Sequence, residues 1–434
     1  MTKRLLTVAT LAFLLLLSCG TPPATPTAIP TPSAVYSDDY RLILDAAWQT
    51  VNDKYFDPTF GGKDWQAIGD EYRQKLATVQ DGETFFLQVL NPMLFELGVS
   101  HLAALPAELV REMEPLTFAT GSLGMDVRLL DGVTVISRVV AGSPAAKAGL
   151  RPGFVITAVD GKTPSEYAAA GLQSPPYNER HQRASAVGGL RATLYGEPGT
   201  EVVIEYLDAT DRPRRATMQL APRGGLSCGE MDPTMPPVCA ELQMERLAHG
   251  VAYLRLSGFL GPVLDGVLQA IDELHDAPAL IIDLRGNPGG QFFVRKAVAS
   301  QLVGVPKPFI RYQYRTKAET AYLDAVPNAY PGRVVILVDE LSASSSEEFA
   351  GSLQALGRAT IIGTQTQGTC LVMNIEILPK GAILIYPYGQ SQTPDGRILE
   401  DNGVVPDIEV VLDRASLLQG KDVQLEAALA FLDQ

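Results

Sequence analysis

The sequence predicts an α/β protein built from several domains, because three stretches of the chain follow different patterns. Residues 38–112 carry apolar side chains at helical spacing, and residues 113–223 hold short runs rich in β-branched residues that favour strands. Residues 241–434 alternate strand-like and helix-like segments, which is typical of a largely parallel sheet covered by helices. The length of 434 residues agrees with this division, because one hydrophobic core rarely organises so long a chain.

Composition and charge exclude several classes of function. The chain has 35 basic and 49 acidic side chains and a formal net charge of −14, which argues against a nucleic-acid partner. Its four histidines and four cysteines are scattered, and neither an HExxH nor a paired CxxC motif occurs. We therefore expect no metal ion and no organic cofactor.

The N-terminus is typical of an export signal. Lys3 and Arg4 precede a short apolar run, and the segment Leu-Leu-Ser-Cys that ends at Cys19 resembles a bacterial lipobox. This resemblance implies that residues 1–18 are a signal peptide and that Cys19 is lipidated, although a plain secretory signal is the alternative. Residues 19–37 are rich in proline and threonine and predict an extended linker. The predicted location is the bacterial cell envelope, with the lipid anchor as the only membrane contact.

Export also bears on the cysteines, because disulfides form in oxidising compartments. Residues 224–240 are predicted to be a loop, since SCGEMDPTMPPVC is rich in glycine and proline. Cys228 and Cys239 flank this loop and could form a disulfide, or they could remain two free thiols. Cys370 has no evident partner in the sequence.

The middle of the chain resembles a PDZ domain. The similarity lies in GSLGMDVRLLDGVTVISRVVAGSPAAKAGLRPGFVITAVDG, with Phe154 where an aspartate is usual. The resemblance implies a small β-rich domain over residues 113–223 whose glycine-rich loop binds the C-terminal carboxylate of a peptide. A loop turned by glycines without any ligand is the alternative. The residues that correspond to the carboxylate-binding loop are Gly121, Ser122, Leu123 and Gly124.

Two segments of the last region carry the strongest motifs. ALIIDLRGNPGG and VVILVDELSASSSEEFAGSLQAL resemble the carboxyl-terminal-processing, or tail-specific, serine peptidases and the related tricorn core protease. The resemblance extends over residues 40–412, and it implies a crotonase-like catalytic domain with an N-terminal helical domain and an inserted PDZ domain. It places the nucleophile at Ser344. It also implies that the oxyanion is bound by the backbone N–H of Ser345 and by that of Gly289 or Gly290.

Local physics gives an independent reason for Ser344. It lies between a predicted strand and a predicted helix, where backbone N–H groups lack partners and the helix dipole is positive. Such N–H groups can stabilise a tetrahedral oxyanion. The alternative is that Ser342 or Ser344 is only the N-cap of the helix, with Glu347 completing a capping box.

A serine nucleophile needs a base, and the lysine that serves most bacterial tail-specific proteases is absent. Thr369 occupies its position, Met373 replaces a supporting glutamine, and Lys380 comes too late in the chain. The tricorn-like relatives use a histidine from an N-terminal Ser-His pair and a glutamate close before a Gly-Val-x-Pro-Asp segment. The corresponding residues here are Ser100, His101 and Glu400, so we expect Glu400 to orient Ser100, Ser100 to orient His101, and His101 to accept the proton of Ser344.

Other interpretations of these residues remain open at this stage. His101 could cap the helix that ends at Leu97-Gly98, and Glu400 could be a surface charge beside Asp401. Three further histidines carry no functional prediction: His181 in a charged loop, His249 in an Ala-His-Gly turn, and His275 near a helix end.

The sequence thus predicts a serine endopeptidase that hydrolyses polypeptides, and the resemblance to a PDZ domain implies that it recognises them by their C-termini. One alternative is a peptide-binding lipoprotein that has lost catalysis but keeps its PDZ domain, and another is a small-molecule serine hydrolase on the same scaffold. An imidazole with its ordinary pKa would lose activity below about pH 6. The sequence does not determine the oligomeric state.

Overall fold

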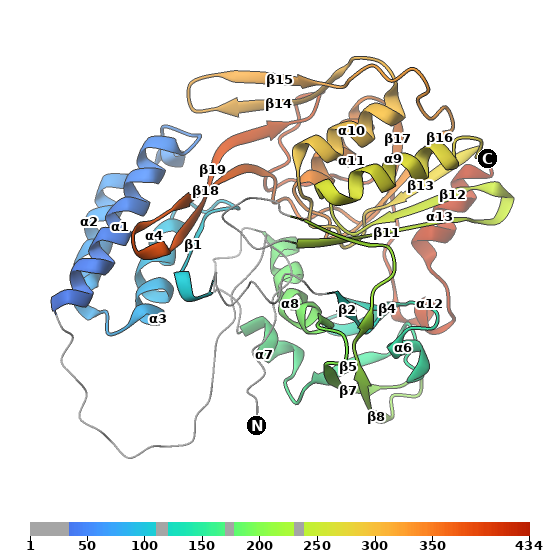
Figure 1. Cartoon of the computed structure of the whole chain (residues 1–434), viewed down its shortest axis with the longest axis horizontal. Coiled ribbons are helices and arrows are strands. Elements are labelled where there is room, and N and C mark those ends of the chain that lie inside the picture. The colour runs from blue at the N-terminus through green and yellow to red at the C-terminus, as the bar shows by residue number, and fades with distance from the viewer. Residues whose placement is uncertain (1–33, 110–119, 170–177, 230–237) are drawn as a thin grey trace.

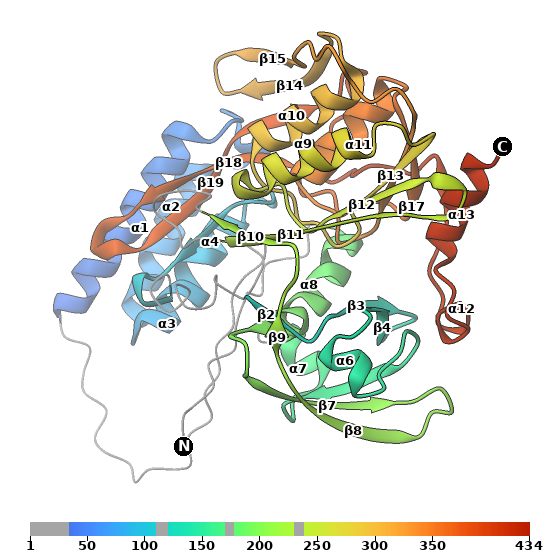
Figure 2. The same cartoon turned by 45° about the vertical axis from the view of Figure 1, so that its right-hand side comes forward.

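The computed structural model describes residues 34–109, 120–169, 178–229 and 238–434. Three units are visible: N-terminal helices in blue, a β-rich unit in green, and an α/β unit in yellow to red (Figure 1). A turned view shows the green unit below the sheet of the α/β unit and the blue helices beside the β18–β19 hairpin (Figure 2). The predicted α/β class with a helical N-terminal region and a PDZ domain is confirmed.

The N-terminal unit consists of one long helix followed by shorter ones, two of which begin at aspartate N-caps. Asp64 accepts a hydrogen bond from Ala67 N–H, and Asp81 accepts one from Thr84 N–H. The first helix begins at Ala34, so the prediction that the linker extends to residue 37 was wrong. The helix starts before the first residue at which the apolar spacing becomes visible in the sequence. The helices are α1 (Ala34–Lys54), α2 (Trp65–Lys75), α3 (Gly82–Phe85) and α4 (Asn91–Phe95), with a π-helix at Phe86–Leu90 and 3₁₀ turns at Phe60–Gly62 and Leu76–Thr78.

A short strand joins this unit to the distant C-terminal region. Strand β1 (Ala103–Leu105) pairs antiparallel with β19 (Ile383–Gln392), and Ala103 lies opposite Ile385. Leu94 and Leu102 pack in the same buried cluster as Leu384, so one hydrophobic core is shared by both regions. Because His101 lies two residues before β1, this pairing delivers it to the C-terminal unit. In the same sheet, β19 also pairs with β14 (Pro308–Tyr314) and with β18 (Leu371–Ile377). Strand β15 (Ala318–Tyr322) pairs with β14.

The green unit is a five-stranded antiparallel sheet with a long helix. Helix α8 (Glu179–Thr193) begins at the N-cap Asn178 and packs beside the edge strand β3 (Met125–Leu130). His181 therefore lies in a helix and is only 1% exposed, so its assignment to a charged loop was wrong. The remaining elements are β2 (Gly121–Ser122), β4 (Val133–Val139), α6 (Pro144–Lys147), β5 (Val155–Val159), α7 (Pro164–Ala169), β6 (Tyr195–Gly196), β7 (Glu201–Leu207), β8 (Pro213–Gln219) and β9 (Ala221–Pro222).

The segment predicted as a loop over residues 224–240 contains two strands. β10 (Leu226–Gly229) pairs antiparallel with β11 (Val238–Arg246), and Cys228 lies directly opposite Cys239. The two cysteines form a disulfide in this structure. The loop prediction was wrong at both ends, because the cross-strand register extends the sheet into residues whose composition favours turns.

The α/β unit is built on a seven-stranded sheet in the order β10-β11-β12-β13-β16-β17-β20. From β12 to β20 all pairs are parallel, as the alternation of strands and helices predicted. The elements are β12 (Ala252–Leu256), α9 (Leu264–Glu273), β13 (Ala279–Asp283), α10 (Phe292–Val303), β16 (Arg333–Val338), α11 (Ser345–Ala355), β17 (Ala359–Gly363), β20 (Ile408–Glu409), α12 (Arg414–Leu418) and α13 (Val423–Leu432), with 3₁₀ turns at Ala248–Gly250, Gly261–Val263 and Pro379–Gly381.

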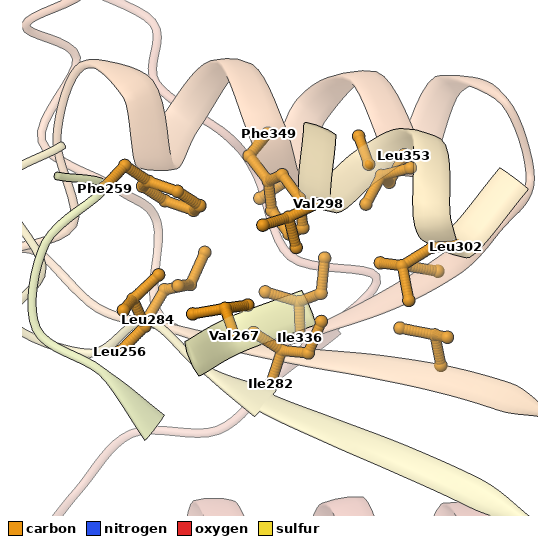
Figure 3. Close-up of a cluster of buried hydrophobic side chains, with 14 of the residues drawn as sticks. Leu256, Phe259, Val267, Ile282, Leu284, Val298, Leu302, Ile336, Phe349 and Leu353 are labelled. Atoms are coloured by element: carbon orange, nitrogen blue, oxygen red, sulfur yellow. The ribbon is translucent and has the colours of Figure 1, made fainter. Parts of the chain in front are cut away.

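Alternating residues of the central strands enter two different cores. Ile282 and Ile336 face helices α9, α10 and α11, and Figure 3 shows them beneath Val298, Phe349 and other apolar side chains of this layer. Ile281 and Leu337, their neighbours in the chain, belong to the opposite core with residues of α13. The sheet is therefore covered on both faces, which explains its nearly continuous apolar strands.

Ion pairs that are removed from water join the green unit to the α/β unit. Arg128 of β3 donates to Asp339 at 2.7 Å, and Arg255 of β12 donates to Asp126 at 3.0 Å. On another side, Arg414 of α12 donates to the Gly153 carbonyl at 2.9 Å. The units are therefore held at several points rather than by a single linker.

We expect Arg128→Met to lower the free energy of unfolding by about 3 kcal/mol, because it leaves Asp339 buried without a counter-charge. Urea denaturation followed by circular dichroism measures this change. The control is Arg183→Met, which removes an exposed pair with Glu179 and should cost at most about 0.5 kcal/mol. Equal effects of the two variants would contradict a structural role for the buried pair.

Candidate active site

Ser344 occupies a tight turn between β16 and α11. Its backbone has φ 53° and ψ −117°, an unusual conformation for a residue with a side chain. The Ser344 N–H donates to the Thr369 carbonyl at 3.0 Å and to the Glu347 carboxylate at 2.9 Å. The turn is thus fixed by its own helix and by the loop before β18, with Ser344 half-buried.

The glycine turn after β13 lies directly against Ser344. Gly289 and Gly290 have φ values of 103° and 140°, which favour glycine over residues with a side chain. A Cβ atom on Gly289 would lie 2.7 Å from the Ser345 nitrogen and 2.9 Å from Ser344 Cβ. The two motifs recognised in the sequence therefore meet at van der Waals distance, and only glycine permits this approach.

The geometry distinguishes between the two glycines proposed as oxyanion donors. The Gly289 N–H donates to Asn287 Oδ1 at 2.9 Å and is therefore occupied. Within the described parts of the chain, neither the Gly290 N–H nor the Ser345 N–H has an acceptor. Ser345 and Gly290 are thus the pair with free donors beside Ser344.

A buried arginine lies behind these donors. Arg295 of α10 donates to Ser345 Oγ at 2.7 Å, and Ser345 Oγ donates to the Gly290 carbonyl at 2.6 Å. Arg295 also forms an ion pair with Glu348 and donates to Tyr312. The side chain of Ser345 therefore ties the nucleophile turn to the glycine turn.

The N-terminal residues form a continuous hydrogen-bonded chain with Glu400. Ser100 donates from its hydroxyl to Glu400 Oε2 at 2.9 Å and from its backbone N–H to Oε1 at 2.9 Å. His101 Nδ1 lies 2.7 Å from Ser100 Oγ. Since the Ser100 hydroxyl proton is directed to Glu400, Ser100 Oγ accepts from His101 Nδ1–H and the lone pair remains on Nε2.

The surroundings of Glu400 and His101 contradict the alternatives that the sequence left open for these two residues. Glu400 is 6% exposed and accepts a third hydrogen bond from Cys370 N–H at 2.7 Å, so it is not a surface charge. His101 has φ 56° and its ring contacts Ser100. Helix α4 ends at Phe95, and no hydrogen bond of the described residues makes His101 its cap.

Ser344 and the Ser100–His101 pair are connected through one short segment. The Thr369 carbonyl accepts from Ser344 N–H, and the next residue, Cys370, donates its N–H to Glu400. Among the described residues no hydrogen bond joins the Ser344 hydroxyl to the His101 ring. Catalytic hydrogen bonds are often long in unliganded enzymes, so this geometry is compatible with a contact that closes around substrate.

Thr369, which stands where lysine-dependent relatives have their catalytic lysine, has a structural role here. Thr369 is 1% exposed, and its hydroxyl donates to Gln367 at 3.0 Å. Lys380 lies in the turn between β18 and β19 and pairs with Asp39 at the protein surface. Neither position therefore supplies a lysine to Ser344.

Burial shifts the pKa values of His101 and Glu400 in opposite directions. Desolvation lowers the pKa of His101 to about 4, so the imidazole is neutral near pH 7. Desolvation raises the pKa of Glu400 to about 7, while its hydrogen-bond donors oppose this rise. The expectation of an imidazole with its ordinary pKa was wrong, because the sequence does not show how much hydration this half-buried ring loses in the fold.

Sequence reasoning missed two residues of α8 that lie close to this site. Burial, followed by the neighbouring His101, lowers the pKa of His181 to about 4. Arg180 donates to the Thr366 carbonyl at 2.7 Å and to the Asp401 carbonyl, linking the loops that carry Thr369 and Glu400. The sequence did offer one signal, because Asn178 is a good helix N-cap. A helix that begins after Asn178 includes both Arg180 and His181.

The predicted carboxylate-binding loop makes hydrogen bonds within the protein. Leu123 N–H donates to the Leu194 carbonyl at 3.1 Å, and Gly124 N–H donates to Ser122 Oγ at 3.2 Å. Gly121 and Ser122 pair with β6 and β9. A peptide carboxylate would have to exchange with the Leu194 carbonyl to reach the Leu123 N–H.

Comparison with known proteins gives matches to three family models. Residues 250–410 match peptidase family S41, residues 36–95 match the tricorn protease C1 domain, and residues 135–171 match a PDZ domain. A carboxyl-terminal-processing protease of Synechocystis is 29% identical over 93% of this chain and 89% of that protein. The carboxy-terminal processing protease CtpB of Bacillus subtilis is 24% identical over 80% of this chain and 66% of that protein.

Solved structures share the fold. The photosystem II D1 C-terminal processing protease has a TM-score of 0.58 at 23% identity, covering 89% of this chain and 98% of that one. Mature CPAF has a TM-score of 0.56 at 16% identity, covering 90% of this chain and 96% of that one.

The fold, the nucleophile turn against the glycine turn and these matches together define a serine-type peptidase, a hydrolase of peptide bonds. More particularly, the chain belongs to the carboxyl-terminal-processing family of serine peptidases, with an S41 catalytic region, a PDZ domain and a tricorn-type N-terminal region. It acts as a serine endopeptidase on polypeptides.

We expect Gly289→Ala to inactivate the peptidase and to destabilise the fold by more than about 1 kcal/mol, because the new Cβ would overlap the Ser345 nitrogen at a positive φ. Peptide cleavage and thermal unfolding measure the two effects. Gly188→Ala is the control, since open space surrounds that helical glycine and alanine should stabilise it slightly. Full activity of Gly289→Ala would show that the two turns do not need this contact.

Proposed function

We propose that this chain is an endopeptidase in which Ser344 is the nucleophile, His101 is the general base and acid, and Ser100 and Glu400 orient His101. The observation that carries this proposal is the hydrogen-bonded chain from Glu400 through Ser100 to His101 Nδ1. It leaves Nε2 of a neutral imidazole as the proton acceptor for Ser344.

The reaction follows from these positions. Ser344 Oγ attacks the carbonyl carbon of the scissile bond while its proton passes to His101 Nε2, and the oxyanion is bound by the N–H groups of Ser345 and Gly290. His101 then returns the proton to the leaving amine as the carbon–nitrogen bond breaks, which leaves an ester on Ser344. A water molecule that gives a proton to His101 then attacks the carbonyl carbon of this ester. As the bond from that carbon to Ser344 Oγ breaks, His101 returns the proton to Oγ, which releases the new C-terminus and restores the serine hydroxyl.

Substrate recognition through a C-terminus is a second part of the proposal. The matched PDZ domain and relatives named carboxyl-terminal-processing proteases support it. The loop Gly121, Ser122, Leu123 and Gly124 would bind the carboxylate once Leu123 N–H releases the Leu194 carbonyl. A direct test is whether amidation of a substrate's C-terminus raises KM while leaving kcat unchanged.

Two features disfavour the alternatives to a peptidase. A lipoprotein that had lost catalysis would have no reason to retain the buried Glu400–Ser100 contact, whose donors offset a large desolvation cost. A small-molecule hydrolase would not account for relatives that match over most of their length and are named processing proteases.

We propose that the protein is exported and held at the cell envelope by a lipid on Cys19. Residues 1–18, Cys19 and the linker up to residue 33 lie outside the described residues, so this proposal is based on the sequence alone. Among the helices that the structure describes, none is both long and apolar enough to cross a bilayer. Metabolic labelling with a radioactive fatty acid, compared between wild type and Cys19→Ala, tests the anchor.

The assignment of the nucleophile and base predicts that Ser344→Ala and His101→Ala each lower kcat by at least about a thousandfold, because they remove a group that acts in the transition state. The measurement is cleavage of an unfolded protein by the purified soluble form. His249→Ala serves as the control, since His249 lies in a 3₁₀ turn on another part of the sheet. Cleavage by Ser344→Ala at the wild-type rate would refute the assignment.

The pKa values predict the pH profile of kcat/KM. The pKa of His101 lies below its ordinary value of 6.5, so the base stays neutral until the pH falls to about 4, and the acid limb due to His101 is centred there. The pKa of Glu400 lies above its ordinary value, so Glu400 loses its charge as the pH falls through about 7. A partial step near pH 7 is therefore expected in the wild type and absent in Glu400→Gln. A single limb at pH 6.5 in both proteins would contradict this account.

A further inference from the structure

Glu347 is a completely buried carboxylate in the first turn of α11, directly behind Ser344. Its Oε2 accepts from Ser344 N–H at 2.9 Å and from Thr369 N–H at 3.1 Å. Its Oε1 accepts from the Thr366 hydroxyl at 2.6 Å and from Gly368 N–H at 2.7 Å. One side chain thus holds the nucleophile turn and the 366–369 loop together.

The nature of these four partners selects a carboxylate at this position. All of them are donors, and only an acceptor-only group can satisfy four donors at once. A glutamine of the same size would direct its NH₂ group at two of them and leave buried donors without acceptors. Burial raises the pKa of Glu347 to about 7, while the four donors and the positive end of α11 favour the charged form.

The backbone of Thr369 and Cys370 connects Glu347 with Glu400, which lies behind His101. Thr369 donates its N–H to Glu347, and Cys370 donates its N–H to Glu400. Two adjacent backbone N–H groups therefore connect the carboxylate behind the nucleophile with the carboxylate behind the histidine. The Thr369 carbonyl also accepts from Ser344 N–H, which closes a ring of hydrogen bonds around the nucleophile backbone.

We propose that Glu347 is a positioning residue of the peptidase reaction, which holds the Ser344 backbone and, through Thr369 and Cys370, fixes its position relative to Glu400, Ser100 and His101. This inference rests on the function proposed above, because it presupposes that Ser344 and His101 react. Glu347 touches neither substrate nor reacting atoms and acts only through the backbone of Ser344. The segment that carries the catalytic lysine in lysine-dependent relatives becomes a rigid connection between two carboxylates here.

The test is Glu347→Gln in the full mature chain. We expect kcat to fall about 100-fold, since small displacements of a reacting group cost rates of this order, while KM changes by less than about threefold. A second readout is the rate at which an alkyl fluorophosphonate forms a phosphorus–oxygen bond to Ser344 with loss of fluoride, the serine proton passing to His101. This rate should fall in parallel with kcat.

A pair of variants on the partner side tests the same contact without altering Glu347. Thr366→Val removes the hydroxyl donor and should lower kcat at least about tenfold, whereas Thr366→Ser restores a hydroxyl and should recover most of kcat. This pair carries the test if Glu347→Gln does not fold. Equal kcat for the valine and serine variants would overturn the inference.

A matched control separates positioning from general stability. Asp126→Asn alters another buried carboxylate, which pairs with Arg255 at the interface between the two units. It should lower Tm but leave kcat of the folded protein unchanged, whereas Glu347→Gln should lower kcat beyond any change in Tm. The inference fails if Ser344→Ala is inactive while folded Glu347→Gln retains wild-type kcat. Cleavage by Ser344→Ala would instead refute the proposed function itself.

Discussion

The contact between Ser100 and Glu400 spans 300 positions of the chain, and the geometry of the candidate site depends on it. Strand β1 pairs with β19, and the N-terminal helices share a hydrophobic core with the β18–β19 hairpin. These interactions deliver Ser100 and His101 to a sheet formed by residues from the other end of the sequence. The candidate site therefore exists only in the fully assembled fold, because neither the N-terminal helices nor the S41 region contains all of its groups.

Two buried glutamates define the electrostatics of the site. Glu347 and Glu400 both lose hydration, and each is compensated by neutral donors rather than by an arginine or a lysine. Because these donors carry no net charge, they position the carboxylates without placing a cation next to His101. The imidazole can then stay neutral, which is the form a general base requires.

The PDZ domain contributes to the surroundings of the nucleophile turn. Leu341, which precedes Ser344 by three residues, packs in one buried cluster with Ala184 and Val187 of α8. Arg180 on the same helix bonds to the loops that carry Thr369 and Glu400. The helix that flanks the edge strand β3 is thus part of the wall of the catalytic unit. A change in the position of α8 would reach Ser344 through direct packing contacts.

The sequence by itself determined the classes of the three units, the order of the strands and helices in the last one, and the family. Those features follow from apolar periodicity and from two local motifs, each of which lies within a single strand and turn. The sequence also indicated Ser344, Ser100, His101 and Glu400, because short motifs of related peptidases mark them.

Only the tertiary structure decided properties that depend on distant residues. It showed that Gly289 N–H is taken by Asn287 Oδ1, whereas Gly290 N–H has no acceptor in the parts of the chain that the structure describes, because the acceptor on Asn287 is reached only in the folded turn. It showed that the half-buried ring of His101 loses hydration and that the buried His181 lies on a helix, since both depend on contacts with other units. It also revealed Glu347 as more than a helix cap, because three of its four donors come from a loop about twenty residues away. Local patterns specify secondary structure and motifs, whereas desolvation and hydrogen-bond partners are set by what the fold places around each side chain.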